Sequence, residues 1–192
     1  MTTTKTYVIN MFSGPGSGKS TLAAELYVYM KKKNYKVEFL QEYAKKLVWE
    51  KDYETLNNQQ FVSNKYYKSI LAMNGCVDFI ILDSSLINGI WYNWNNPDNL
   101  SNMEKTEKLI HKYYNEFNNI NFFINRGNYQ YENLGRIQSE AESRQIDKEL
   151  RSIVERLDIP YKDINIEDGD AILSIMGELE ATTSKCVLGG DS

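Results

Sequence analysis

The sequence is poor in the residues that build metal centres and disulfide frameworks. Its 192 residues include one His, two Cys and three Pro. Cys76 and Cys186 are too few for a disulfide scaffold, and neither lies at the spacing of a metal-ligand motif. A single His likewise argues against a His-rich zinc site. Chemistry in this protein must therefore come from carboxylates, Lys, Arg, hydroxyl groups and backbone amides.

Long apolar runs and an excess of positive charge are also missing. No run approaches the roughly 18 apolar residues of a membrane span, and residues 1–12 lack the basic and then apolar pattern of a secretory signal. We therefore expect a cytoplasmic protein without a membrane partner. The chain carries 22 Lys and Arg against 26 Asp and Glu, so nucleic-acid binding, which depends on many basic contacts to phosphates, is not expected. The aromatic content permits a homodimer, although no segment marks an interface.

Apolar runs alternate with helical patterns along the chain. This alternation predicts an α/β fold with a central parallel sheet of about five strands between two helical layers, and ligands should bind at the carboxyl ends of the strands. The length predicts one domain over residues 1–180, followed by a flexible tail at 181–192. The expected strands cover residues 7–12, 36–40, 77–82, 120–124 and 161–166, and the expected helices cover about 19–33, 41–50, 57–74, 103–117, 146–157 and 170–179.

The most informative segment is a glycine-rich run that follows the first expected strand and opens the first expected helix. Glycines let successive backbone amides turn inward around an anion, and the helix N-terminus adds its positive dipole end. We expect Lys19 to bind the β- and γ-phosphates of ATP and Ser20 to ligate Mg²⁺. One departure is Ser13, which stands where the strict phosphate-loop pattern has Gly. The run is Ser13, Gly14, Pro15, Gly16, Ser17, Gly18, Lys19, Ser20 and Thr21.

This run resembles the phosphate loop of nucleoside monophosphate kinases, within the superfamily of P-loop nucleoside and nucleotide kinases. The end of the third expected strand, residues 80–85, resembles the second acidic motif of these enzymes. Residues 41–45 and 135–138 resemble a branch that includes ribosylnicotinamide kinase domains and phage deoxynucleotide kinases. The resemblance implies a three-layer P-loop fold with acceptor-binding helices in about 41–75 and a small helical lid in about 126–145.

Two carboxylates follow expected strands at the same edge of the sheet. Asp83 ends the most apolar strand and can hold Mg²⁺ directly or through water, or else cap the next helix. Glu42 comes just after the second expected strand. In the nucleoside kinases that this chain resembles, an acid at this place accepts the proton of a sugar hydroxyl. Glu42 can also bind a sugar or a base, or serve only as a favourable acid at a helix N-terminus.

Three of the five arginines, Arg126, Arg136 and Arg144, come at the end of the fourth expected strand and across the loop beyond it. Phosphoryl transfer spreads negative charge over three oxygens, and Arg is the matching donor. The resemblance implies that Arg126 and Arg136 act in a lid that closes over ATP. Arg144 can act there too, or pair with Glu140 one helical turn earlier.

These features predict an ATP- and Mg²⁺-dependent phosphotransferase that converts a (deoxy)nucleoside monophosphate to the diphosphate. The alternative is a nucleoside kinase, including one for a nicotinamide riboside-like acceptor, since residues 1–125 contain no Arg to hold an acceptor phosphate. A nucleotide-binding switch that hydrolyses NTP slowly is a further alternative, weakened by the missing guanine-reading motif. A kinase for DNA ends is disfavoured by the acidic balance.

Overall fold

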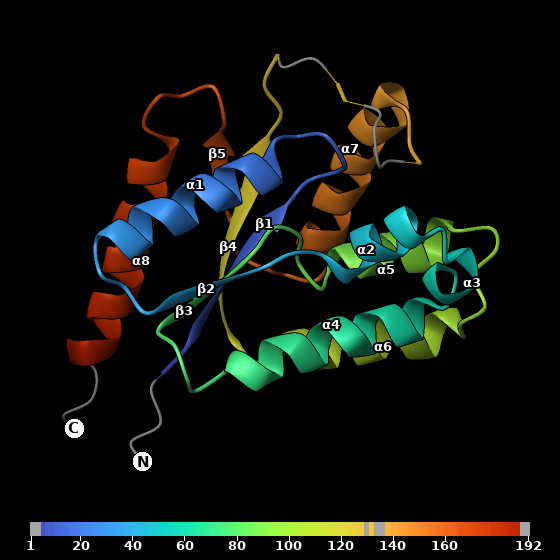
Figure 1. Cartoon of the computed structure of the whole chain (residues 1–192), viewed down its shortest axis with the longest axis horizontal. Coiled ribbons are helices and arrows are strands. Elements are labelled where there is room, and N and C mark those ends of the chain that lie inside the picture. The colour runs from blue at the N-terminus through green and yellow to red at the C-terminus, as the bar shows by residue number, and fades with distance from the viewer. Residues whose placement is uncertain (1–4, 129–130, 133–136, 189–192) are drawn as a thin grey trace.

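The protein is built on a five-stranded parallel sheet, as the sequence predicts (Figure 1). The computed structural model describes residues 5–128, 131, 132 and 137–188. The strand order is β2-β3-β1-β4-β5, and every neighbouring pair is parallel. The strands are β1 (Tyr7–Phe12), β2 (Val37–Leu40), β3 (Phe79–Leu82), β4 (Asn118–Asn125) and β5 (Lys162–Asn165).

Helices cover both faces of the sheet and give it three layers (Figure 1). Helices α1 (Lys19–Lys32) and α8 (Ala171–Leu188) share one hydrophobic core with the sheet. Helices α4 (Gln59–Met73), α5 (Asn88–Asn95), α6 (Met103–Tyr114) and α7 (Glu140–Arg156) share the other core. The short helices α2 (Tyr43–Glu50) and α3 (Tyr53–Leu56) contact α4.

The two cores follow from the alternation of side chains along the central strand. All six residues of β1 are buried. Ile9 and Met11 belong to the core under α1 and α8, whereas Val8 and Phe12 belong to the opposite core. Successive side chains of a strand point to opposite faces, so a central parallel strand must be apolar on both. This explains why the largely apolar run at residues 7–12, in which Asn10 is the one polar residue, predicts a strand correctly.

The structure differs from the expected elements in three places. Helix α8 runs to Leu188, so residues 181–188 are not the expected flexible tail; no Gly or Pro interrupts residues 178–188. Helices α3 and α5 were not expected, because their Asn-rich surroundings favour loops. In the described part of the expected lid, helix begins only at Glu140, where Ser139 and Glu142 form a capping box.

The strand ends bring four separate segments to one edge of the sheet. The phosphate loop follows β1, Glu42 comes two residues after β2, Asp83 follows β3 directly, and Arg126 follows β4 directly. Parallel strands end at a common edge, so these residues converge although up to 113 positions, from Ser13 to Arg126, separate them. Among the described residues, no helix is both long and apolar enough to cross a membrane.

Helix α1 offers a matched test of the core. Leu26 is fully buried, whereas Val28 on the same helix is 49% exposed. We expect Leu26→Ala to lower the free energy of unfolding by about 2–5 kcal/mol and Val28→Ala to change it by less than about 0.5 kcal/mol. Chemical denaturation followed by circular dichroism measures both values. Equal effects of the two substitutions would contradict the assignment of α1 to the core.

Candidate functional site

The phosphate loop joins β1 to α1 and presents a helix N-terminus without a side-chain cap. Gly16 and Gly18 have φ angles of 70° and 93°, in the left-handed region that favours glycine. Gly18 occupies the N-cap position of α1, makes no side-chain cap hydrogen bond, and is followed by a first turn without an acidic residue. The first amides of a helix lack intrahelical acceptors. The N-terminus of α1 is therefore suited to bind an anion such as a phosphate.

Lys19 lies folded over this loop. Its Nζ donates hydrogen bonds to the carbonyl oxygen of Gly14 at 2.7 Å and to Ser17 Oγ at 3.4 Å. Burial lowers the pKa of Lys19 to about 8, although the nearby carboxylates of Glu42, Asp147 and Asp83 act to raise it. A bound polyanion would favour the charged ammonium further. This environment suits a lysine that binds phosphate oxygens.

Asp83 connects the phosphate loop to the segment after β2. Its Oδ2 accepts a hydrogen bond from Ser20 Oγ at 3.1 Å, and its Oδ1 accepts one from the Glu42 amide at 2.8 Å. The side chain is buried, and this burial raises the pKa of Asp83. A hydroxyl and a carboxylate are hard oxygen ligands, and Mg²⁺ in nucleotide sites uses few protein ligands together with substrate phosphates. Ser20 and Asp83 therefore fit the magnesium site that the sequence predicts.

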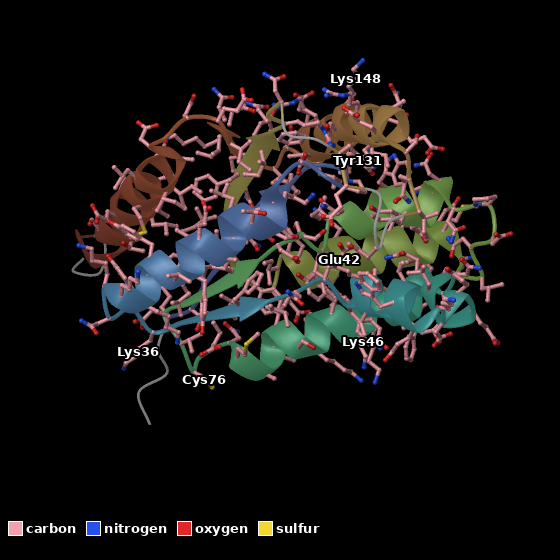
Figure 2. The ribbon with its side chains drawn as sticks, turned by 45° about the horizontal axis from the view of Figure 1, so that its top comes forward. Lys36, Glu42, Lys46, Cys76, Tyr131 and Lys148 are labelled. Atoms are coloured by element: carbon pink, nitrogen blue, oxygen red, sulfur yellow. The ribbon has the colours of Figure 1, made fainter. Side chains whose placement is uncertain are left out.

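Glu42 lies half-buried at the start of α2, where it lines the cavity beside Asp83 (Figure 2). It is the N-cap residue of α2 but makes no side-chain cap hydrogen bond, so a capping role does not account for its carboxylate. Burial, followed by the negative charge of Asp83, raises the pKa of Glu42 to about 7. Lys46, one turn along α2, lies at the surface by contrast (Figure 2). A carboxyl group with a pKa near neutrality is suited to exchange protons at physiological pH.

A cavity of about 890 Å³ extends from the phosphate loop toward α3 and the connection between α5 and α6. This volume accommodates two small-molecule substrates. Burial raises the pKa of Tyr92 well above its ordinary value, so its hydroxyl stays protonated and can donate a hydrogen bond. Amide and aromatic side chains dominate the wall far from the loop, namely Tyr53, Asn57, Trp91, Tyr92, Asn95 and Asn96.

The cavity wall carries more negative than positive side chains. Among the described residues that line it, the cations are Lys19 and Lys45. The carboxylates of the lining are Glu42, Asp83, Asp98, Glu142 and Glu149. Lys19 belongs to the phosphate loop, where the first substrate would bind. Among the described lining residues, Lys45 is therefore the cation that can face a second substrate.

The structure places the three arginines that were candidates for the lid differently. The Arg126 side chain is 8% exposed and pairs with Asp147 of α7, with 2.8 Å between Nε and Oδ2. Its guanidinium also donates to the Pro15 carbonyl at 2.9 Å. The Arg126 guanidinium is therefore engaged with Asp147 and with the backbone of the phosphate loop in this structure. Arg136 lies outside the described residues. Arg144 is exposed and pairs with Glu140, the alternative that the sequence allows.

Asp147 is a site residue that the sequence analysis missed. Its Oδ1 accepts hydrogen bonds from Ser13 Oγ at 2.8 Å and from the Gly14 amide at 2.6 Å. One signal was present in the sequence. Asp147 lies next to Ile146 and one turn before Leu150 and Arg151, inside the apolar stripe of a predicted helix, where an unpaired charge is unfavourable.

The strand order, the phosphate loop and Asp83 together define a P-loop protein with a kinase-like, nucleotide-binding fold. Residues 8–168 match the family described as chromatin associated protein KTI12, and the chain belongs to this family. No curated protein matches the sequence.

Three solved structures with the same fold are described as kinases or as complexes with an ATP analogue. A NadR protein in complex with NAD and AMP-PNP has a TM-score of 0.64 and 13% identity over 95% of this chain. The chain spans 50% of that NadR protein. The deoxyadenosine kinase of M. mycoides, solved with dCMP and dCDP, has a TM-score of 0.56 and 18% identity over 92% of this chain and 99% of its own. The APS kinase CysC of Mycobacterium tuberculosis, with AMPPNP and APS, has a TM-score of 0.50 and 10% identity over the same shares.

The raised pKa of Glu42 predicts a pH dependence of stability. The unfolded chain releases this proton near pH 4.5, whereas the folded protein keeps it until about pH 7. Glu42 therefore costs stability as the pH rises through this window, because the unfolded state then binds fewer protons. We expect the Tm of Glu42→Gln, relative to the wild type, to rise by a few degrees across the window.

Thermal unfolding at several pH values measures this difference. Glu38→Gln removes a carboxylate from the surface of β2 and is the matched control. A Tm difference between Glu42→Gln and the wild type that does not change with pH would contradict the buried, protonated state of Glu42.

Proposed function

We propose that the protein is an ATP-dependent phosphotransferase whose acceptor is a hydroxyl group of a nucleoside-like small molecule. The observation that carries this proposal is the Glu42 carboxyl, with a pKa near 7, beside Asp83 at the phosphate-loop end of the cavity. A hydroxyl acceptor must lose a proton during transfer, and a base with this pKa is suited to take it. A phosphate acceptor needs no such base, because it is already anionic.

The charge of the cavity supports the same choice. A monophosphate acceptor carries two negative charges that need compensation by Arg or Lys. Beyond the phosphate loop, the described lining offers Lys45 against five carboxylates. The amides and aromatic rings of the far wall suit a sugar and a base, which hydrogen-bond and stack. The shortage of cations in the described part of the lining therefore supports a hydroxyl acceptor.

In this proposal, each site residue has a separate role in phosphoryl transfer. Lys19 and the free amides at the N-terminus of α1 bind the β- and γ-phosphates of ATP. Glu42 accepts the proton of the acceptor hydroxyl, whose oxygen forms a bond to the γ-phosphorus while the bond to the β–γ bridging oxygen breaks. Ser20 and Asp83 would hold Mg²⁺, which supplies charge compensation for the phosphates when bound.

A nucleoside monophosphate is the second candidate acceptor, as the sequence first suggests. Lys45 lines the cavity two residues beyond the start of α2, where it can approach an acceptor phosphate. The deoxyadenosine kinase of the same fold was solved with a nucleoside monophosphate and diphosphate bound. A nucleotide-binding switch predicts ATP hydrolysis that no small acceptor stimulates.

Removal of Lys19 tests phosphate binding and transfer. We expect Lys19→Ala to lower kcat/KM for ATP at least about 100-fold, since a charged hydrogen bond to phosphate is lost in a buried site. Lys148→Ala removes an exposed lysine from α7 and should have no effect (Figure 2). Coupled measurement of ADP release gives both values. Wild-type activity in a folded Lys19→Ala protein would refute the proposed role.

An acceptor panel with Mg-ATP distinguishes the candidates. We expect phosphorylated product from one or more nucleosides, with kcat/KM rising with pH toward a plateau above about pH 7, because the free enzyme must present ionised Glu42. Glu42→Gln should lose this rise and most of its activity, whereas Glu38→Gln should keep both. Product from monophosphates alone would establish the second candidate, and acceptor-independent hydrolysis would establish the switch.

A further inference from the structure

Asp147 of α7 is the meeting point of three segments that are distant in sequence. Its Oδ1 accepts hydrogen bonds from Ser13 Oγ, from the Gly14 amide and, at 3.1 Å, from a terminal nitrogen of Arg126. Its Oδ2 accepts one from Arg126 Nε at 2.8 Å. Both carboxylate oxygens are therefore used, and the side chain is 19% exposed. Such charge-assisted, bidentate contacts hold their groups in a defined geometry.

Arg126 extends this contact across the phosphate loop. Its guanidinium donates to the carbonyl oxygens of Pro15 at 2.9 Å and Ser143 at 3.3 Å. The phosphate loop is thus held through the side chain of Ser13, the amide of Gly14 and the carbonyl of Pro15. These three residues lie on the N-terminal side of Gly16 and Gly18, and α1 begins only at Lys19.

Helix α7 packs directly on the backbone of the loop. A Cβ atom at Gly14 would lie 2.6 Å from the carbonyl oxygen of Ser143 and 3.0 Å from Asp147 Oδ1. Only glycine allows this approach, because the first of these atoms is backbone. Ser13, in turn, places a hydroxyl donor where the strict phosphate-loop pattern has Gly, and that donor is used on Asp147.

The same glycine connects Asp147 to Lys19. The Gly14 amide donates to Asp147, and the Gly14 carbonyl accepts from Lys19 Nζ at 2.7 Å. A shift of the Gly14 backbone would therefore move the acceptor that holds the lysine. Tyr131 also joins the segment after β4 to α7, with 2.9 Å between its hydroxyl oxygen and Ser143 Oγ.

We propose that Asp147 is a positioning residue for ATP binding: with Arg126 it clamps the Ser13–Gly14 turn against α7 and thereby sets the position of Lys19. Helix α7 also lines the cavity through Gln145 and Glu149, so the clamp connects the nucleotide subsite with a wall of the cavity. The proposal rests on the proposed function in taking ATP as the ligand. It gives Arg126 a positioning role in place of the catalytic one expected from the sequence.

The chain offers a matched control pair on the same helix. Arg151 of α7 pairs with Asp163 of β5, with 2.7 Å between its terminal nitrogen and Oδ1. This pair also joins α7 to the sheet, but neither residue lines the 890 Å³ cavity or contacts the phosphate loop. Asp147→Asn and Asp163→Asn therefore remove the same charge from the same kind of pair, and only the first disturbs the loop.

The test compares these variants in two measurements. Hydrogen–deuterium exchange of a peptide covering residues 11–22, without nucleotide, reports directly on the Gly14 amide. We expect faster exchange in Asp147→Asn and no change in Asp163→Asn. Calorimetric titration with Mg-AMP-PNP should show affinity about tenfold weaker in Asp147→Asn, with KM for ATP raised and kcat nearly unchanged. Ser13→Ala, which keeps the ion pair, should show a smaller loss in the same direction.

Failure of the clamp, failure of the positioning role and failure of the proposed function give different results. Unchanged exchange in Asp147→Asn overturns the clamp. Faster exchange with unchanged AMP-PNP affinity overturns the positioning role, as does an equal loss of affinity in Asp163→Asn. If Asp147→Asn fails to fold, Ser13→Ala decides by the same two readouts. Clamp-dependent exchange and AMP-PNP affinity without transfer to any acceptor would support the clamp and refute the proposed phosphotransferase.

Discussion

The site depends on the burial of one cation, Lys19, at the N-terminus of α1. An ammonium group removed from water is unfavourable unless charge and hydrogen bonds compensate it. Asp83 and Asp147 supply negative charge, Glu42 adds to it when ionised, and the Gly14 carbonyl accepts a hydrogen bond. The loop, the strand ends and α7 are therefore held in a mutual arrangement, because each contributes one part of this compensation.

The same arrangement explains why Glu42 keeps its proton near neutral pH. Asp83 already uses both oxygens on Ser20 and on the Glu42 amide. Burial of Glu42, followed by the negative charge of Asp83 beside it, disfavours a second carboxylate and raises the pKa of Glu42 to about 7. Two carboxyl groups at one sheet edge thus acquire different properties. One is suited to a metal ion, and the other is suited to proton transfer.

Much of the fold could be read from local patterns. The apolar run of β3 and the largely apolar run of β1 predict central parallel strands because such strands are buried on both faces. The phosphate loop, Asp83 and Glu42 could be placed at one edge because parallel strands end together. Helix α5 could not be read in this way, since packing of residues such as Ile90 and the fully buried Asn93 overrides the weak helix propensity of its surroundings. Helix α3 is a single turn without a buried residue, so no apolar pattern marks it in the sequence.

By itself, the sequence determined the sheet of parallel strands, the phosphate loop and the candidate ligands Lys19, Ser20 and Asp83, because contiguous residues create each of these signals. Tertiary structure decided how Asp147 and Arg126 are used. Asp147 meets Ser13 across 134 positions of the chain, and its ion pair with Arg126 engages an arginine that the family resemblance implies for a lid. It also decided the charge of the cavity, because that depends on which side chains from seven or more separate segments face one space. Periodicity and spacing report on neighbours along the chain, whereas such contacts arise only when the packed helices and strands bring distant side chains together.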